Sequence, residues 1–310
     1  MINLKSKIYV AGHNGLVGSA IIRKLKLKGY KNLIFRSKKQ LNLKDQTKVF
    51  KFLKKNKPDF IFIAAAKVGG IYSNNKYKAE YFFDNISIQS NLINSAYLCG
   101  VKNLIFLGSS CVYPKHCKQP IKEDYLLTGG LEKTNDAYAI AKIAGIKMCE
   151  SYNLQYKTNY KCLMPTNTFG PNDNYDKLNS HFFPALIKKA YELKVKNKLE
   201  LKVWGSGAAK REVIYVDDIA DACVYFMKKK FKEDIINIGT GKDHTIKWYS
   251  KFIMKQLGIK FKIRFDKTKP DGTPRKLLDV NLAKKYGWVS KTSLKEGFHK
   301  TFDAYVKKYG

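Results

Sequence analysis

Three glycines stand at positions 12, 15 and 18, directly after a short apolar run at residues 7–11 and extending into a helical segment expected at residues 16–28. Glycines at this spacing allow a tight turn, a close approach of backbone to a pyrophosphate, and close packing of helix on strand. The N-terminus of the helix then offers unpaired N–H groups to phosphate oxygens. This turn predicts a Rossmann-type α/β fold that binds a dinucleotide through Gly12, His13, Asn14, Gly15, Leu16, Val17 and Gly18.

Short apolar runs continue to alternate with helical stretches, as is typical of a doubly wound parallel sheet. Strands are expected at 7–11, 32–36, 60–64, 103–107 and 160–164, and helices near 16–28, 45–55, 77–99 and 137–156. After Pro165 the pattern loosens, with a helix near 181–196 and a strand at 199–204. Residues 213–216, the helix from Asp217 and residues 235–238 are expected to rejoin the main sheet.

Two interwoven lobes follow from this order. The dinucleotide-binding Rossmann domain is expected to span residues 1–178 and about 213–240. A smaller substrate-binding α/β lobe is expected to span residues 179–212 and 241–310, with elements at 247–258, 261–265, 280–286 and from 293 onward.

The charge of the chain invites a nucleic-acid interpretation, because 59 Lys and Arg against 25 Asp and Glu give a formal net charge of +34. Only five of these basic residues are arginines, however, and the lysines are spread along the whole chain. Base recognition and phosphate forks favour arginine. We therefore expect no nucleic-acid partner and a small-molecule substrate instead.

No apolar run reaches 18 residues, so no membrane span is expected, and the N-terminus leads into the first strand without the apolar stretch of a signal peptide. Six cysteines, at 99, 111, 117, 149, 162 and 223, lie scattered rather than paired. This pattern favours a reducing cytoplasm over a disulfide scaffold, and it predicts no metal site.

The end of the second strand indicates which dinucleotide binds. An acidic residue there would bind the ribose hydroxyls of NAD. This chain has Arg36, Ser37, Lys38 and Lys39 instead. A cation and a hydroxyl suit a 2′-phosphate, so we expect NADP, with Arg36 as the residue that selects it.

Tyr138 and Lys142 stand four residues apart on a predicted helix and therefore share one face. Ser109 and Cys111 stand two apart after the strand at 103–107, so on an extended backbone they point the same way. The Lys142 ammonium is expected to lower the pKa of the Tyr138 phenol, and Ser109 can hold a carbonyl oxygen on which charge develops. On residues alone, Cys111 is either a functional thiol or a small buried apolar side chain.

Long motifs in a fixed order resemble one family. They lie at residues 10–18, 64–71, 107–114, 138–145, 164–167, 179–181, 204–207 and 269–276. In these motifs the chain resembles the extended short-chain dehydrogenases/reductases and, among them, the GDP-L-fucose synthase family. The resemblance implies a 3,5-epimerase/4-reductase that converts GDP-4-keto-6-deoxy-D-mannose to GDP-L-fucose with NADPH. It also implies a homodimer formed through the helices near 77–99 and 137–156.

The resemblance assigns roles to individual residues. Ser109, Tyr138 and Lys142 would form the reductase triad, and Cys111 and His181 the base and acid of epimerisation, with the assignment at each carbon left open. Contacts to the GDP-sugar would come from Lys189, Trp204, Arg211 and Asp271, with Lys276 a further candidate. The implied cofactor contacts beyond the glycine turn and Arg36 are Leu107, Gly108, Ser109, Ser110, Lys142, Pro165, Thr166, Asn167, Thr168 and His181.

One departure and two alternatives remain at this point. The family often has an arginine where this chain has Asn14, so Arg36 is expected to hold the 2′-phosphate nearly alone. Another nucleotide-sugar epimerase or dehydratase is an alternative, although dehydratases carry an acidic pair where this chain has Cys111 and Val112. A non-catalytic dinucleotide- or RNA-binding protein is the second, and it would have no need of the triad.

Overall fold

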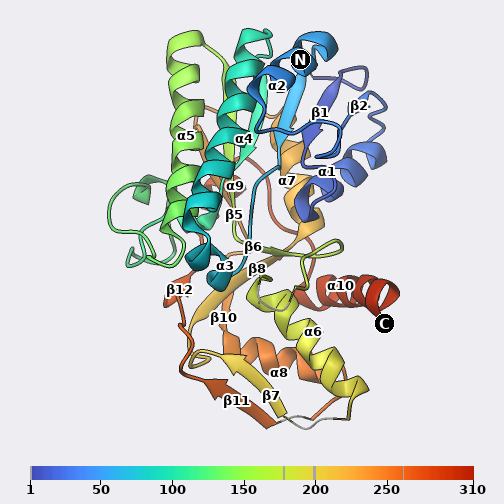
Figure 1. Ribbon diagram of the computed structural model, residues 1–310, viewed down its shortest axis with the longest axis vertical. Helices are drawn as coiled ribbons and strands as arrows, with labels where there is room; N and C mark the ends of the chain where they lie inside the picture. Colours follow the sequence, from blue (N-terminus) through green and yellow to red (C-terminus); the bar gives the residue numbers. More distant parts are fainter. Residues whose placement is uncertain (1, 177–178, 198–199, 261) are drawn as a thin grey trace.

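A six-stranded sheet in the order β2-β1-β3-β4-β5-β9 forms the centre of the larger lobe (Figure 1). The computed structural model describes residues 2–176, 179–197, 200–260 and 262–310. All neighbouring strands of this sheet run parallel. They are β1 Ile8–Ala11, β2 Leu33–Ile34, β3 Phe60–Ile63, β4 Asn103–Leu107, β5 Asn159–Pro165 and β9 Ile235–Ile238.

Helices cover both faces of the sheet, which explains why its strands are apolar at nearly every position. On one face lie α1 (Leu16–Leu27) and α7 (Val216–Lys228), and on the other α2 (Gln46–Asn56), α4 (Lys78–Leu98) and α5 (Asp136–Tyr156). Strand β1 pairs with β2 on one side and β3 on the other, so the chain reverses direction across the sheet there. Ligands of open α/β sheets bind at the carboxyl ends of strands at such a point.

The smaller lobe is built around β8 (Lys210–Tyr215), which pairs with β10 (Asp243–Thr245), β12 (Arg275–Lys276) and β6 (Asn167–Phe169). A second sheet joins β7 (Glu200–Trp204) to β11 (Lys262–Asp266). The helices of this lobe are α6 Phe182–Val195, α8 Ile246–Gln256 and α10 Leu294–Tyr309. Helix α9 (Asn281–Lys285) packs against β9 of the larger lobe instead, although residues 280–286 were expected in the smaller lobe. The short helix α3 (Ile71–Lys76) precedes α4, and 3₁₀ turns lie at Ser110–Val112 and Glu123–Tyr125.

The predicted Rossmann-type sheet is confirmed, with one error in its membership. Residues 213–216 were expected in the main sheet, but residues 213–215 belong to β8 of the smaller lobe and Val216 opens α7. An apolar run predicts a buried strand without specifying its partners, which is the physical source of the error. Helix α7 and strand β9 do return to the larger lobe. The expected boundaries at residues 178, 199 and 261 lie outside the described residues.

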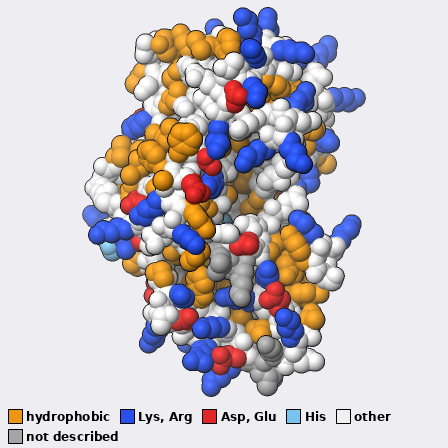
Figure 2. Space-filling model, viewed as in Figure 1, with side chains coloured by type: hydrophobic (Ala, Val, Ile, Leu, Met, Phe, Trp, Pro, Cys, Tyr) orange, Lys and Arg blue, Asp and Glu red, His pale blue; other side chains and the backbone are white. Residues whose placement is uncertain are grey.

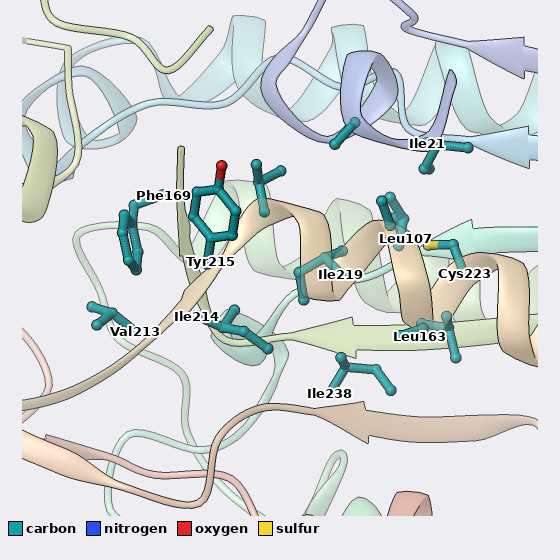
Figure 3. Packing of buried hydrophobic residues seen from close by; sticks show 14 of the residues in the cluster. Ile21, Leu107, Leu163, Phe169, Val213, Ile214, Tyr215, Ile219, Cys223 and Ile238 are labelled. Atoms are coloured by element: carbon teal, nitrogen blue, oxygen red, sulfur yellow. The ribbon is translucent and has the colours of Figure 1, made fainter. Parts of the chain in front are cut away.

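The apolar core passes from one lobe into the other without interruption. Figure 3 shows Ile21 of α1 and Cys223 of α7 packed over Leu107, Leu163 and Ile238 of the main sheet, with residues of β8 continuing the same cluster. A second cluster fills the space under α2, α4 and α5 on the opposite face. The two lobes are therefore one packed unit.

A buried carboxylate adds a polar link across the same region. Glu212 of β8 has no exposed surface, and its carboxylate accepts backbone N–H groups of Thr240 at 2.5 Å, Gly241 at 2.7 Å and Leu278 at 2.9 Å. Burial raises the pKa of this carboxyl group, and the three hydrogen bonds oppose that rise. Glu212 thus ties together the chain segments that follow β9 and β12.

Candidate active site

The glycine turn between β1 and α1 leaves no room for a side chain at Gly12 or Gly18. Gly12 has a φ of +85°, and a Cβ there would lie 2.7 Å from the Ala65 backbone nitrogen. A Cβ on Gly18 would lie 2.1 Å from the Gly12 carbonyl oxygen. Gly15 begins α1 without a side-chain cap, and the first turn of α1 contains no acidic residue. The N–H groups of this helix end are therefore available to an anion, and the turn fits the pyrophosphate of a dinucleotide.

Arg36 lies exposed just past β2, beside this turn. Its guanidinium donates to the Phe35 carbonyl oxygen at 2.8 Å and lies 5.6 Å from the centre of the Phe52 ring. The Phe35 ring in turn packs against the His13 ring at 4.8 Å. Asn14 is exposed in the turn, and Leu16 and Val17 lie half-buried in the first turn of α1. This arrangement leaves the Arg36 fork accessible to a phosphate.

The carboxyl end of β4 carries the predicted hydroxyl and thiol. Gly108 donates its N–H to the Leu163 carbonyl, and a Cβ there would lie 2.3 Å from the Met164 sulfur. Ser109 is extended, but the backbone then enters the 3₁₀ turn Ser110–Val112, with the Cys111 N–H donating to the Ser109 hydroxyl at 3.2 Å. The expectation of extended backbone through Cys111 is therefore wrong, although both side chains still face α5.

Tyr138 and Lys142 of α5 close the site from the other side, and both are buried. The Tyr138 phenol is hydrogen-bonded to the Ser109 side chain and lies close enough to Cys111 to feel a charge on its sulfur. The Lys142 ammonium donates to the Leu107 carbonyl at 2.8 Å and lies 6.0 Å from the centre of the Tyr138 ring. The structure thus brings Ser109, Cys111, Tyr138 and Lys142 together.

The pKa of Tyr138 moves in the direction opposite to the one expected from the sequence. Burial, and then the charge of Cys111, raises the pKa of Tyr138 far above its ordinary value, and the Ser109 hydrogen bond opposes the rise. Burial lowers the pKa of Lys142 to about 7, with Cys162 opposing that shift. At neutral pH the phenol therefore keeps its proton, which suits a proton donor better than a base.

The positive charge of Lys276 acts on both Cys111 and His181. The Lys276 ammonium lies 3.3 Å from the Cys111 sulfur. Burial raises the pKa of the Cys111 thiol, but the Lys276 charge and hydrogen bonds from Ser109, Lys276 and Asn135 outweigh burial and lower it. Burial and the Lys276 charge also lower the pKa of His181, which stands immediately before α6.

The approach of α6 to the larger lobe explains how His181 reaches this place. The Gly70 N–H donates to the Asn179 carbonyl at 2.9 Å, and a Cβ on Gly70 would lie 2.4 Å from the Ser180 carbonyl oxygen. The loop after β3 therefore packs directly against the residues before α6. Figure 2 shows the surface hollowed where the two lobes meet, with Lys and Arg side chains scattered over the whole visible face.

The four residues expected to contact a nucleotide sugar gather in the smaller lobe. The Lys189 ammonium lies 5.7 Å from the centre of the Trp204 ring. Asp271 accepts the N–H and the hydroxyl of Ser206, and its own carbonyl accepts from the Arg211 guanidinium at 2.9 Å. Arg211 is buried, whereas Trp204 exposes 36% of its surface. A ring face beside cations suits a base and a diphosphate.

Residues 165–168 lead from β5 into the smaller lobe. The side chains of Thr166 and Asn167 both donate to the Glu212 carbonyl oxygen, at 3.3 Å and 2.8 Å. The Thr168 hydroxyl donates to the Thr166 carbonyl. The segment that includes Pro165 is thereby fixed beside the ends of β4 and β9.

Asn135 is the site residue that sequence reasoning missed. Its side chain hydrogen-bonds Cys111, while its amide oxygen is buried with no hydrogen-bond partner in the described part of the chain. The signal was present, because Asn135 precedes Tyr138 by three residues and so shares its side of the helix start. Within the described ranges, no three His, Cys, Asp or Glu side chains form a group that could hold a metal ion.

A sequence model of the NAD dependent epimerase/dehydratase family matches residues 8–239. GDP-L-fucose synthase 1 of Arabidopsis thaliana is 48% identical over 307 residues, which cover 99% of this chain and 95% of the relative. GDP-L-fucose synthase of Escherichia coli is 45% identical over 312 residues, covering 98% of this chain and 97% of the relative.

A solved structure agrees in fold. The GDP-D-glycero-L-gluco-heptose synthase of Campylobacter jejuni, determined in the presence of NADPH, superposes with a TM-score of 0.90 at 32% identity. The match covers 99% of this chain and all of that one. The similarity therefore extends over both lobes.

Proposed function

The chain belongs to the NAD dependent epimerase/dehydratase family, and on that premise we propose that it is a GDP-L-fucose synthase. It converts GDP-4-keto-6-deoxy-D-mannose to GDP-L-fucose by epimerisation at C3 and C5, followed by NADPH-dependent reduction of the C4 keto group. One observation carries the proposal: the thiol of Cys111 shares a site with the Ser109 and Tyr138 hydroxyls. A reductase alone has no use for that thiol.

The glycine turn and Arg36 would hold NADPH, which supplies the hydride for C4 when it is bound. The tight approach of Gly12 and Gly18 and the uncapped start of α1 support pyrophosphate binding at residues 12–18. The exposed Arg36 fork supports 2′-phosphate binding. Residues 107–110 and 165–168, with Lys142 and His181, would line the nicotinamide side.

Epimerisation begins at the C4 carbonyl, which acidifies the protons on C3 and C5. Ser109 and Tyr138 donate hydrogen bonds to the carbonyl oxygen, so each enolate forms at reduced cost. Inversion requires removal of a proton from one face of the sugar and return of a proton to the other. Cys111 and His181 are the two groups that share this task, since each titrates within reach of neutral pH.

Reduction uses the same carbonyl oxygen. Tyr138 gives its proton to the oxygen as the C4 alcohol forms, and the raised pKa of the phenol ensures that this proton is present at neutral pH. Lys142 holds the end of β4 in place through the Leu107 carbonyl. One set of hydroxyls therefore serves both halves of the reaction.

The GDP part of the substrate would occupy the smaller lobe. Arg211 and Lys189 are the cations for the diphosphate, Trp204 offers a ring face, and Asp271 orders the turn at Ser206. We assign substrate binding to residues 179–212 and 241–310 and cofactor binding to residues 1–178 and about 213–240, with β8 shared because its strand lies in the smaller lobe.

We further propose a cytoplasmic homodimer. All six cysteines are free, which suits a reducing compartment. No helix in the described segments is long and apolar enough to cross a membrane. Helices α4 and α5 pack side by side and carry apolar side chains that face solvent, and hydrophobic atoms cover this region in Figure 2. The exposed residues are Phe82, Phe83, Leu98, Ile140 and Leu154.

To test this function, the purified protein is incubated with GDP-4-keto-6-deoxy-D-mannose and NADPH in heavy water. We expect NADPH consumption and GDP-L-fucose with deuterium at C3 and C5. Cys111→Ser should lose most of that deuterium while still binding NADPH. Well-folded protein that consumes no NADPH would refute the function, and undiminished deuterium in Cys111→Ser would remove the thiol from the mechanism.

A further inference from the structure

Lys276 lies where it can act on the proposed epimerisation chemistry. Its ammonium is 3.3 Å from the Cys111 sulfur, although the two residues are 165 positions apart in the chain. Both side chains are half-buried. In the described part of the chain, no carboxylate lies within the 4.0 Å ion-pair distance of Lys276. Among the described residues, the Cys111 sulfur is therefore the hydrogen-bond partner of the Lys276 ammonium.

The position of Lys276 is fixed by the strand that carries it. Strand β12 pairs in parallel with β8, which places Lys276 opposite Arg211. The next two residues are also anchored: the Leu277 N–H donates to the Gln119 side-chain oxygen at 2.9 Å, and the Leu278 N–H donates to Glu212. The anchored backbone fixes the point from which the Lys276 side chain reaches the sulfur.

We propose that Lys276 stabilises the thiolate of Cys111 and so prepares this side chain to accept a proton during epimerisation. The inference rests on the proposed function. In the step, the sugar C–H bond breaks, its proton forms an S–H bond on Cys111, and the electron pair moves onto the C4 oxygen as an enolate. A C–H bond then forms on the opposite face with a proton from the His181 imidazolium. Exchange with solvent restores both groups, so protons balance over the cycle.

The other groups around the thiol are compatible with this role. Arg211 of β8 adds a second positive charge close enough to interact with Cys111. The negative charges of Asp271 and Glu132 also act on the Arg211 guanidinium and partly offset its charge. Tyr138 of α5 remains neutral at working pH. Cys117 and His181 are the titratable groups on the Lys276 side. Burial and the Lys276 charge lower the pKa of His181, which makes its imidazolium a stronger acid but reduces the fraction of it that is protonated at neutral pH.

The test measures Cys111 directly, without substrate. Iodoacetamide alkylation of Cys111 is followed by peptide mass spectrometry from pH 5 to 10, with Cys99 of the same chain as an internal reference. The pH midpoint is the readout, since it follows the thiolate fraction whatever the intrinsic nucleophilicity. We expect a wild-type midpoint below the ordinary ~8.5 of a thiol. Lys276→Met should raise it by about one unit or more, a tenfold loss of thiolate below the midpoint.

Lys276→Arg should keep the midpoint near that of the wild type, because it restores the charge. An unchanged midpoint in Lys276→Met would overturn the proposal. A raised midpoint in Lys276→Arg would also overturn it, provided that this variant is as stable to unfolding as the wild type. These outcomes do not depend on which sugar the enzyme takes, so they are separate from a failure of the proposed function.

A second readout separates chemistry from binding. Oxidation of GDP-L-fucose by NADP⁺ transfers a hydride from C4 and a proton from its hydroxyl, and it needs no epimerisation. The loss that Lys276→Met causes in deuterium entry at C3 and C5 should exceed its loss in oxidation rate by at least about tenfold, since only the first includes the effect on Cys111. Equal losses in both would identify Lys276 as a substrate-binding or structural residue and refute its role at Cys111.

Discussion

The Lys142 ammonium donates a 2.8 Å hydrogen bond to the Leu107 carbonyl, joining the middle of α5 to the carboxyl end of β4. Both residues are buried, and burial lowers the pKa of Lys142 to about 7. The protein thus holds a side chain at its catalytic centre that is partly uncharged at neutral pH. This placement stabilises the site geometry by a hydrogen bond while the buried charge costs stability.

The pH dependence of stability should reveal that cost. In the unfolded chain Lys142 binds its proton up to about pH 10.5, but in the folded protein only up to about pH 7. The unfolded state therefore holds the extra proton between these values, and the penalty is full below pH 7 and absent above pH 10.5. Any stability that Lys142→Met gains should be largest near pH 6.5 and shrink by up to about 4 kcal/mol towards pH 10. Urea unfolding of both apoproteins measures this; a pH-independent difference would contradict it.

The glycine turn predicts a steric requirement at Gly18. An added Cβ would lie 2.1 Å from the Gly12 carbonyl oxygen, so Gly18→Ala must push the turn apart. Overpacking of this kind costs about 1–3 kcal/mol, and we expect NADPH affinity to fall about tenfold or more. Gly130→Ala is the control, because a Cβ there meets nothing within 4 Å. Titration of NADPH fluorescence measures both, and unchanged binding by Gly18→Ala would argue against pyrophosphate at this turn.

Arg36 should decide between the two nicotinamide dinucleotides. A charge-assisted hydrogen bond contributes about 1.5–3 kcal/mol, so Arg36→Ala should raise KM for NADPH roughly 10- to 100-fold. KM for NADH should stay unchanged, since NADH lacks the 2′-phosphate. Arg264→Ala removes another exposed arginine, which faces Glu200 at 3.8 Å, and should alter neither value. Equal losses for both dinucleotides would show that Arg36 does not contact the 2′-phosphate.

Glu212 should be a stability determinant without a role in the chemistry. Glu212→Ala would leave the N–H groups of Thr240, Gly241 and Leu278 without their acceptor, of which the Leu278 bond is buried and the other two are half-buried. A buried unsatisfied group costs about 1–3 kcal/mol and a half-buried one less, so we expect a loss of about 2 kcal/mol or more in free energy of unfolding. Glu200→Ala, at a half-exposed surface glutamate of β7, should cost less than about 1 kcal/mol. Urea unfolding compares the two, and equal effects would contradict the assigned role.

The apolar surface of α4 and α5 predicts self-association. A chain of 35.6 kDa should sediment at about twice that mass. Phe82→Glu would place a carboxylate on each copy in the buried contact and should shift the protein towards monomer. Leu27→Glu changes an exposed leucine of α1 and should leave the mass unaltered. A wild-type protein that remains monomeric at micromolar concentration would refute the dimer.

The sequence predicts those strands whose limits are set by their own residues and immediate neighbours. Strand β4 begins and ends where expected, at Asn103 and Leu107, because Gly100 and Gly108 bound an apolar run. Strands β10 and β12 were missed because they are only three and two residues long and are polar. Both strands form by pairing with β8. The sequence of β8 did not indicate that this strand belongs to the smaller lobe.

The candidate site likewise has features that residue spacing predicts and features that only the fold creates. Tyr138 and Lys142 could be paired from their spacing, but the directions of their pKa shifts could not be predicted, because burial depends on the packing of α5 against β4. The contact of Lys276 with Cys111 joins residues 165 positions apart, and only the register of β12 on β8 creates it. Spacing identifies groups on one element, whereas charge coupling between elements requires the fold.

The interleaving of the two lobes also sets the sequence of events during translation. Strand β5 is complete at Pro165, but its neighbour β9 begins only at Ile235, after α6, β7, β8 and α7 have been made. Until then the nascent chain carries an open β5 edge, a surface on which strands of other chains can pair. A chain that ends between these positions would therefore keep the β5 edge exposed and be prone to aggregate.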